Sequence, residues 1–370
     1  MPKTRGAPDF TLFITVLALV SFGVVMVFSA SMYSGLVNYH DSFHFLKLQV
    51  VWVILGLAAM VFAMNYDYRN LRRLAGPALA VALVLLVAVL VPGVGKEVSG
   101  ARRWFIVGPL VFTPSELVKL CVVVFFAFGL SRRRENLQNL RSMMPFLVLL
   151  GVACGLILIE PDMGTAVTLA GTVLVMFFAA GANLGSLAGL GLAGLGLAVA
   201  AIAAAPYRIN RVTGFLNPWK DLQGQGYQIV QSLYALGSGG LFGVGLGQSK
   251  LKFLWLPASH TDFIFAIVGE ELGFLGATML IMLFGIFAWR GYKIALTAPD
   301  PFAALLAAGL TTGIVLQAVI NMGVVTSSLP VTGIPLPLVS YGGTSVVFTL
   351  VGVGILLNIS RFCGEKQGAS

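Results

Sequence analysis

Long apolar runs are the feature that most constrains the fold of this chain. About ten segments of roughly 20 mostly apolar residues recur along its 370 residues, and a helix of that length crosses the ~30 Å hydrocarbon core of a bilayer. Only 10% of the residues are charged, against about 25% in soluble domains. The sequence therefore predicts an all-α polytopic membrane protein. The expected spans are residues 10–31, 45–64, 74–92, 113–131, 143–159, 163–182, 186–205, 263–288, 302–325 and 341–360.

The distribution of lysine and arginine predicts the orientation, because short cytoplasmic loops are enriched in these residues. With the N-terminus in the cytoplasm, 13 of the 23 Lys and Arg fall in inner segments. This bias favours an even number of spans and two cytoplasmic termini. It also explains the net charge of +9, so no nucleic-acid partner is expected. The inner cations are Lys3, Arg5, Arg69, Arg72, Arg73, Arg132, Arg133, Arg134, Arg141, Arg290, Lys293, Arg361 and Lys366.

Eight cations fall instead in two outer loops. One interpretation is snorkelling of their side chains toward lipid phosphates, and the other is a site for an anionic headgroup on the outer face. The larger loop, about residues 206–262, lies between the seventh and eighth spans, and residues 1–370 are expected to form a single integral membrane domain. The outer cations are Lys96, Arg102, Arg103, Arg208, Arg211, Lys220, Lys250 and Lys252.

Two pairs of charged residues lie in or beside spans. In "TPSELVKL", Glu116 and Lys119 are three residues apart, so they share a helix face and can pair. That pair is either a structural salt bridge or the wall of a watery cavity. In "IEPDMGTA", Glu160 and Asp162 lie at the outer membrane edge. They can raise each other's pKa or share a cation, or Asp162 can cap the next helix.

Three carboxylates surround the start of the eighth span, in "LPASHTDFIFAIVGEELGFLGA". Asp262 lies at its outer mouth, where a partly desolvated carboxylate has a raised pKa and can act as a general base. Glu270 and Glu271 lie about 12–13 Å deeper along a helix and are expected to hold helices together or to tune the site. The preceding "GGLFGVGLG" is expected to form a re-entrant turn buried in protein. Lys250 and Lys252, two residues apart, are expected on one side of an extended segment.

Several of these stretches resemble motifs of the SEDS family (shape, elongation, division and sporulation), which includes RodA, FtsW and SpoVE. The resemblance covers nearly the whole chain, and "FSAS" and "RVTGFLNPW" lean toward the FtsW/SpoVE branch. Two departures stand out: Thr113 replaces a frequent Gln, and Ala258 and Ser259 stand where an acidic residue is common. The motifs, in order, are "FSAS", "GARRW", "PSELVKL", "PDMGTA", "GYQIVQSLYALGSGGLFGVGLGQSKLK", "LPASHTDFIFAIVGEELG" and "LPVTGIPLPLVSYGGTS".

The resemblance implies a ten-helix glycosyltransferase of the bacterial cytoplasmic membrane that polymerises lipid II at the outer face, with inversion and undecaprenyl pyrophosphate as leaving group. The family's key acidic residue corresponds to Asp262. Cations suited to stabilise the pyrophosphate are Arg102, Arg103, Lys250 and Lys252, and residues suited to line the cavity are Glu116, Lys119, Asp162 and Lys47.

The family also implies partners and leaves a cofactor question. A class B penicillin-binding protein is expected beside the eighth and ninth spans, together with proteins of the division or elongation complex. A divalent cation, Mg²⁺ or Mn²⁺, could assist, although no metal ligand is assigned. The alternatives are a lipid II flippase, which would use the same cavity and basic residues, and a scaffold that only recruits the penicillin-binding protein.

Overall fold

The computed structural model describes residues 6–363, apart from 99, 109, 133–139, 223, 225 and 254. The described residues form twelve α-helices, two short 3₁₀-helices and a small antiparallel sheet. Five of the predicted inner cations, Lys3, Arg5, Arg133, Arg134 and Lys366, lie outside the described residues.

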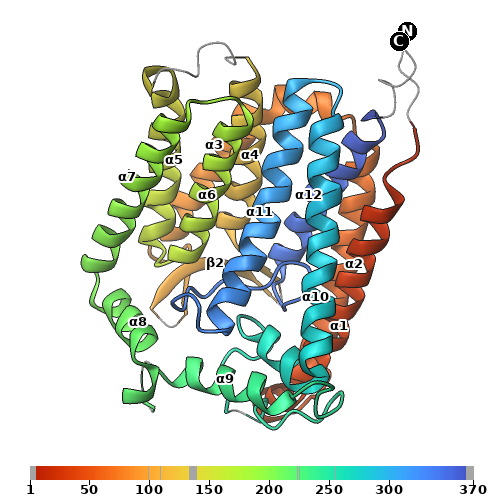
Figure 1. The fold of residues 1–370 in the computed structure, drawn as a ribbon, viewed down its shortest axis with the longest axis vertical. Helices are drawn as coiled ribbons and strands as arrows, with labels where there is room; N and C mark the ends of the chain where they lie inside the picture. The colour runs from red at the N-terminus through yellow and green to blue at the C-terminus, as the bar shows by residue number, and fades with distance from the viewer. Residues whose placement is uncertain are drawn as a thin grey trace.

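Ten of the helices overlap the ten predicted spans, although α1 and α10 extend well beyond the predicted ends at residues 31 and 288, and they form the upright bundle of Figure 1. Among the helices of the described residues, eight are long and apolar enough to cross a membrane, and α6 and α12 are shorter apolar helices. The chain is therefore a multi-pass membrane protein. The helices are α1 (Phe10–Tyr39), α2 (His44–Asn65), α3 (Leu71–Leu90), α4 (Pro114–Ser131), α5 (Leu140–Ile159), α6 (Met163–Ala179), α7 (Leu184–Ala203), α10 (Ile264–Thr297), α11 (Pro301–Val325) and α12 (Thr344–Ser360).

The first and last described segments meet at one end of this bundle. The Gly6 amide donates to the Arg361 carbonyl at 3.0 Å, and the Asp9 amide donates to the Ser360 hydroxyl at 2.9 Å. The Asp9 carboxylate also caps α1 and pairs with Arg290 of α10. An even number of spans requires this arrangement, and the basic residues predict that this end faces the cytoplasm.

α11 lies in the centre of the bundle and α7 at its edge. In α11, 72% of the most apolar window is buried, against 6% in α7. α11 packs against α4, α6 and α10, whereas α7 stands at the left margin of Figure 1 with only Leu187 buried. A helix that is apolar all round but exposed faces lipid rather than protein.

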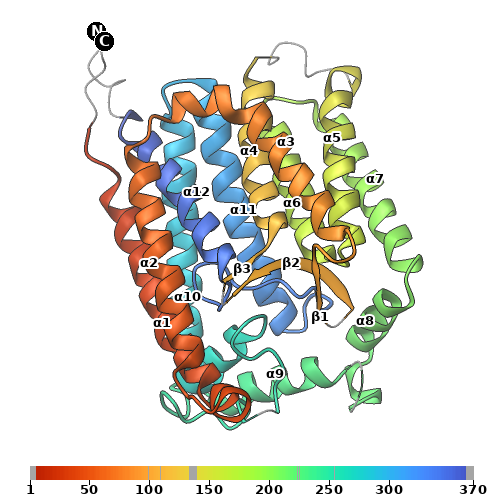
Figure 2. The ribbon, with the colours of Figure 1, turned by 180° about the vertical axis from the view of Figure 1, so that it is seen from behind.

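At the opposite end, the two outer loops contain more secondary structure than the sequence suggested. Residues 93–112, predicted as a loop, form strands β1 (Lys96–Val98), β2 (Ala101–Val107) and β3 (Leu110–Phe112) in the order β1-β2-β3. Phe105 pairs with Phe112 across the ladder, and such aromatic pairs stabilise a hairpin. Residues 206–262 contain α8 (Pro206–Leu216), η3 (Pro218–Lys220) and α9 (Tyr227–Gly239). Figure 2 shows α8 and α9 lying across the end of the bundle rather than along it.

Candidate functional site

Asp262 lies in the loop that leads into α10. Hydrogen bonds from α11 and from the segment of residues 330–341 hold that loop in place. Asn321 of α11 donates to the carbonyl oxygens of Asp262 and Ile334, both at 2.8 Å. The Ser340 hydroxyl donates to the Thr261 carbonyl at 2.6 Å. These contacts fix the backbone of Asp262 while its side chain stays half-buried, which is the arrangement expected of a positioned general base.

The electrostatic surroundings of Asp262 leave its carboxylate able to accept a proton. Burial and the nearby Asp162 raise its pKa to about 6, and Arg103 and Arg211 oppose that rise. Among the described residues, no cation lies within 4 Å of this carboxylate. A pKa near 6 keeps Asp262 mostly ionised at neutral pH and close to the value at which a base works best.

Arg211 of α8 belongs to the same site, although sequence reasoning placed it only among the outer cations. A Cβ added at Gly333 would lie 3.8 Å from Asp262 Oδ2 and 3.9 Å from Arg211 Nη1. The guanidinium has one long hydrogen bond, 3.5 Å to the Val331 carbonyl. The amphipathic character of α8 was the available signal, because it turns this side chain toward the protein while the helix lies at the bundle's end.

Arg103 of β2 reaches the loop between α5 and α6 and meets Asp162 there, a contact that the sequence did not predict. Arg103 Nε donates to the Glu160 carbonyl at 2.6 Å, its Nη2 donates to the Pro161 carbonyl, and its Nη1 lies 3.5 Å from Asp162 Oδ2. Asp162 also caps α6 by accepting from the Thr165 amide at 3.0 Å. The predicted cap by Asp162 is confirmed, whereas Glu160 and Asp162 do not share a cation through their carboxylates: Arg103 pairs with that of Asp162 and contacts Glu160 only at its backbone carbonyl.

Glu160 is a buried carboxyl without a partner. Neither of its carboxyl oxygens has a hydrogen-bond partner in the described part of the chain. Burial and Asp162 raise its pKa to about 8, against the opposing charge of Arg103. Glu160 is therefore mostly protonated at neutral pH and carries an O–H donor near Asp162. Neighbouring carboxyls with separated pKa values are typical of acid–base sites.

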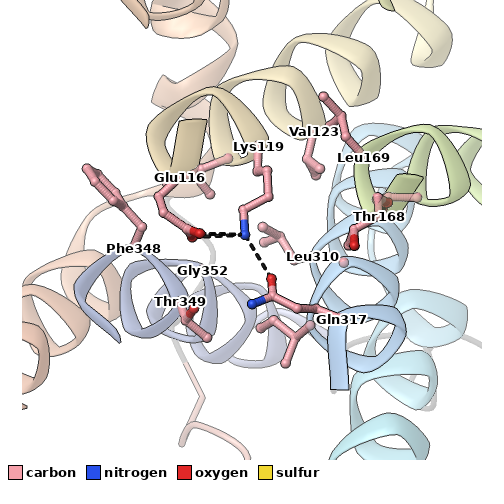
Figure 3. A pocket seen from close by; sticks show the side chains of 15 residues that line it. Glu116, Lys119, Val123, Thr168, Leu169, Leu310, Gln317, Phe348, Thr349 and Gly352 are labelled. Carbon is pink, nitrogen blue, oxygen red and sulfur yellow. Dashed lines mark hydrogen bonds and ion pairs between the residues drawn. The ribbon is translucent and has the colours of Figure 1, made fainter. Parts of the chain in front are cut away.

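A cavity inside the bundle contains the predicted ion pair (Figure 3). Lys119 lies 2.9 Å from Glu116 and donates to Gln317 Oε1 at 2.8 Å. These groups line an otherwise mostly apolar space of about 530 Å³ between α4, α6, α11 and α12. The ion pair is confirmed, and it does face a cavity. Asp262 does not line this space, but Gln317 links the two regions, since its Nε2 donates to the Pro335 carbonyl at 2.9 Å.

Glu270 and Glu271 lie in a buried polar network that joins α10, α1 and the loop before α10. Glu271 accepts from the Ser29 hydroxyl at 2.7 Å and from Lys252 at 3.1 Å. Glu270 accepts from the Ser249 hydroxyl and from the Lys250 amide.

The prediction that Lys250 and Lys252 share one side of an extended segment is wrong. The chain turns there, so that Lys252 is buried and Lys250 is exposed.

The glycine-rich segment after α9 wraps a break in α10. Gly273 has φ 67° inside the helix, which frees backbone groups that the segment then satisfies. The Val244 amide donates to the Glu270 carbonyl at 3.0 Å, and the Phe274 amide donates to the Gly240 carbonyl at 2.8 Å. A Cβ at Gly239 would lie 1.9 Å from the Gly269 carbonyl oxygen. The glycine turn predicted from the sequence is present, but the expectation that protein buries it is wrong: Leu241, Phe242, Val244 and Leu246 are exposed, and only Gly239 is buried against α10. Only glycine permits the close approach at Gly239.

Three other predicted site residues lie apart from the Asp262 cluster. Lys47 pairs with Asp41 at 2.7 Å, and Arg102 pairs with Glu97 at 2.8 Å, both on exposed surface. Lys250 is exposed. Their contribution to substrate binding stays a prediction that the contacts within the chain do not support.

The residues at this site do not by themselves fit a resident metal ion. No group of three His, Cys, Asp or Glu side chains suited to a metal occurs in the described part of the chain. Asp162, the carboxylate that influences Asp262, is already engaged by Thr165 and Arg103. No reaction step is therefore derived through a metal held by the protein. The three cysteines, Cys121, Cys154 and Cys363, are free.

Comparison with known proteins gives a consistent result. The family model of FtsW, RodA and SpoVE, described as cell cycle protein, matches residues 10–365. The chain is 46% identical to stage V sporulation protein E of Bacillus subtilis over 98% of this chain and 99% of that protein. It is 43% identical to the probable peptidoglycan glycosyltransferase FtsW of Trichlorobacter lovleyi, over 95% and 93%.

Solved structures resemble the fold over nearly its whole length. A chain of a peptidoglycan synthase complex that coordinates polymerization and crosslinking superposes with a TM-score of 0.80 at 34% identity, covering 97% of this chain and 99% of that one. The rod shape determining protein RodA of Thermus thermophilus superposes with a TM-score of 0.72 at 32% identity, covering 96% and 97%.

Proposed function

The chain belongs to the FtsW, RodA and SpoVE family of cell cycle proteins, and on that premise we propose that it is a peptidoglycan glycosyltransferase that polymerises lipid II. The membrane is the bacterial cytoplasmic membrane, and the reaction takes place at its outer face. One observation carries the proposal: Asp262 is a half-buried carboxylate with a pKa of about 6, and none of the described residues forms an ion pair with it, at the predicted outer mouth of a span. Such a group suits proton abstraction from a sugar hydroxyl.

The proposed step is a single displacement. Asp262 accepts the proton of the acceptor's GlcNAc 4-hydroxyl as that oxygen forms a bond to the anomeric carbon of the donor. The bond from this carbon to undecaprenyl pyrophosphate breaks, the electron pair leaves with the pyrophosphate, and α configuration becomes β. Protonated Asp262 then returns its proton to solvent. A positioned base of this kind contributes roughly 10²–10⁴-fold to the rate.

Arg211 and Arg103 have different capacities to stabilise the leaving pyrophosphate. Arg103 already donates to two carbonyls and faces Asp162, so its main role is to hold the loop of Glu160 and Asp162. Arg211 makes one long hydrogen bond and keeps donors available. We assign Arg211 as the cation that meets the developing negative charge, and the buried Glu160 as part of the loop that positions Asp162.

Partners and a metal ion belong to the same proposal. Similarity to a chain of a peptidoglycan synthase complex supports pairing with a class B penicillin-binding protein, placed beside α10 and α11, within the division or elongation complex. Mg²⁺ or Mn²⁺ would be carried chiefly by the substrate's phosphates, since Mg²⁺ is commonly held by one or two carboxylates plus phosphates. Removal of divalent ions with EDTA, followed by readdition, tests this point.

The test is polymerisation of purified lipid II by the full chain together with its class B partner. Asp262→Asn keeps the shape of the side chain and removes the base, and Glu97→Gln removes an exposed outer carboxylate as a matched control. We expect glycan strands from wild type and Glu97→Gln, and a loss of at least about 100-fold in Asp262→Asn. Equal rates for both variants would refute the role of Asp262. No polymer from wild type, combined with lipid II translocation in vesicles, would favour the flippase instead.

A further inference from the structure

A pocket lined by four arginines lies at the predicted cytoplasmic end of the bundle, and it shares no residue with the cluster around Asp262. Its empty volume is about 760 Å³. The start of α3 and the preceding η1 (Tyr68–Asn70) supply one wall, and the end of α4 supplies the other. The lining residues are Arg69, Asn70, Arg72, Arg73, Phe128 and Arg132.

The positive charge of this arginine pocket is poorly compensated by the protein. Arg72 pairs with Asp300 at 2.7 Å, and Asp300 is further occupied by the Tyr68 hydroxyl at 2.7 Å. The nearby Asp67 carboxylate accepts from the Arg69 backbone amide. Among the described residues, no carboxylate forms an ion pair with Arg69, Arg73 or Arg132. Within the described residues, three of these guanidinium groups therefore share one pocket with no carboxylate within 4 Å, and Asp67 and Asp300 act on Arg69 only from a greater distance.

The side chains of the pocket are nonetheless held in place. Arg132 lies 4.4 Å from the Phe128 ring centroid, and Arg69 lies 5.1 Å from that of Phe362. Arg72 lies 4.9 Å from the Phe302 ring centroid, and its buried Nε has no hydrogen-bond partner in the described part of the chain. A buried, unpaired donor is costly, so an acceptor from outside the chain would complete this site.

The position of the arginine pocket indicates where that acceptor comes from. α3 begins and α4 ends here, so the pocket lies at the level of phospholipid headgroups. Apolar surface adjoins it, since Phe128 lines the pocket and Leu74, next to Arg73, is 47% exposed. A ligand with a charged end and an apolar body matches both features, which a soluble anion does not.

We propose that this arginine pocket binds the phosphate of an anionic phospholipid from the inner leaflet. Guanidinium groups bind phosphate oxygens through paired N–H donors, and basic pockets between membrane helices on the cytoplasmic side are suited to anionic headgroups. The lipid would fasten the ends of α3 and α4 to each other. This inference does not depend on the glycosyltransferase activity.

The experiment is lipid titration of the full, delipidated chain in neutral detergent, with bound lipid counted by native mass spectrometry. Phosphatidylglycerol is the probe, and phosphatidylcholine is the uncharged reference. The test variant is Arg73→Gln/Arg132→Gln. The control is Arg141→Gln, an exposed arginine at the same end of the bundle that does not line the pocket. Unfolding midpoints in the neutral detergent verify that both variants remain folded.

We expect phosphatidylglycerol to bind wild type in preference to phosphatidylcholine, and the double variant to bind it about 25-fold more weakly, at roughly fivefold for each arginine. Arg141→Gln should bind as wild type does. Equal weakening in Arg141→Gln and the double variant would show attraction to general surface charge and overturn the site. Inorganic phosphate binding as tightly as phosphatidylglycerol would overturn the assignment to lipid.

Discussion

Replacing Lys252 tests whether the buried network at α10 is structural. The side chains of Lys252 and Glu271 are both 0% exposed, with 3.1 Å between Nζ and Oε1. Lys252→Met keeps the chain length but removes the ammonium beside the buried Glu271 carboxyl, which retains the Ser29 hydroxyl and, at 3.3 Å, the Ser249 amide as donors among the described residues. Removing one partner of a buried ion pair costs about 3–5 kcal/mol, so we expect a loss of that size in the free energy of unfolding.

The measurement is unfolding of the purified chain by SDS, followed by tryptophan fluorescence. Lys250→Met is the matched control, because that lysine lies two residues away and is exposed; its effect should be within about 0.5 kcal/mol. The double variant Lys252→Met/Glu271→Gln removes both charges and should recover much of the loss, since no uncompensated charge remains.

The network is not structural if Lys252→Met is as stable as Lys250→Met. The same follows if the losses in the free energy of unfolding from the two substitutions simply add in the double variant. A structural role of Lys252 also has a kinetic consequence. At temperatures well below its unfolding midpoint, Lys252→Met should keep the KM of wild type for lipid II, because this ammonium bonds to Gly247, Ser29 and Glu271 inside the protein. A large rise in KM would instead return Lys252 to the substrate site, as the sequence first suggested.

Three further perturbations examine the site and the break in α10. For Asp262, kcat/KM should rise with pH to a plateau with its midpoint near 6, because the base acts when deprotonated. The pKa of Asp262 is raised from 3.8, so the folded state disfavours the ionised form. The stability that this group contributes is therefore present below about pH 4 and lost as pH rises through 6. Asp262→Asn should thus raise the unfolding midpoint at pH 7.5 and lose that advantage at pH 4, and a gain independent of pH would contradict the assignment. Arg103→Lys removes the forked donors to two carbonyls and should lower the polymerisation rate about tenfold. The rate of Arg102→Lys, a substitution on exposed surface, should stay within about twofold of wild type. Equal losses in the two variants would refute the positioning role of Arg103. Gly239→Ala places a methyl group 1.9 Å from a carbonyl oxygen and should cost about 1–3 kcal/mol, while Gly237→Ala, which meets nothing within 4 Å, should be neutral or mildly stabilising in thermal unfolding.

Most of the helix order could be predicted from the sequence, because each span is a local property of about 20 apolar residues. The Glu116–Lys119 pair was predictable for the same reason, since three residues along one helix face suffice to bring the two charges together. Asp262 at the outer mouth of α10 also followed from its place at the edge of an apolar run.

Contacts between distant segments could not be predicted in this way. The small sheet before α4 and the helix α8 were missed, since both are short and form against neighbours. Lys250 and Lys252 have the same residue type and nearly the same position, yet one is exposed and the other is fully buried. No local pattern separates them, because the difference depends on Glu271 lying 19 residues later.

The amino-acid sequence by itself determined that the chain spans a membrane repeatedly and that an acidic group lies at the mouth of a span; the side of the membrane on which this mouth lies is a prediction from the basic residues. These properties depend on hydrophobic length and on the placement of charge along the chain. Only the tertiary structure decided which polar groups meet: Arg211 near Asp262, Arg103 on the loop of Glu160, and Lys252 on Glu271. Buried charges need partners, and the packing of helices far apart in sequence chooses those partners.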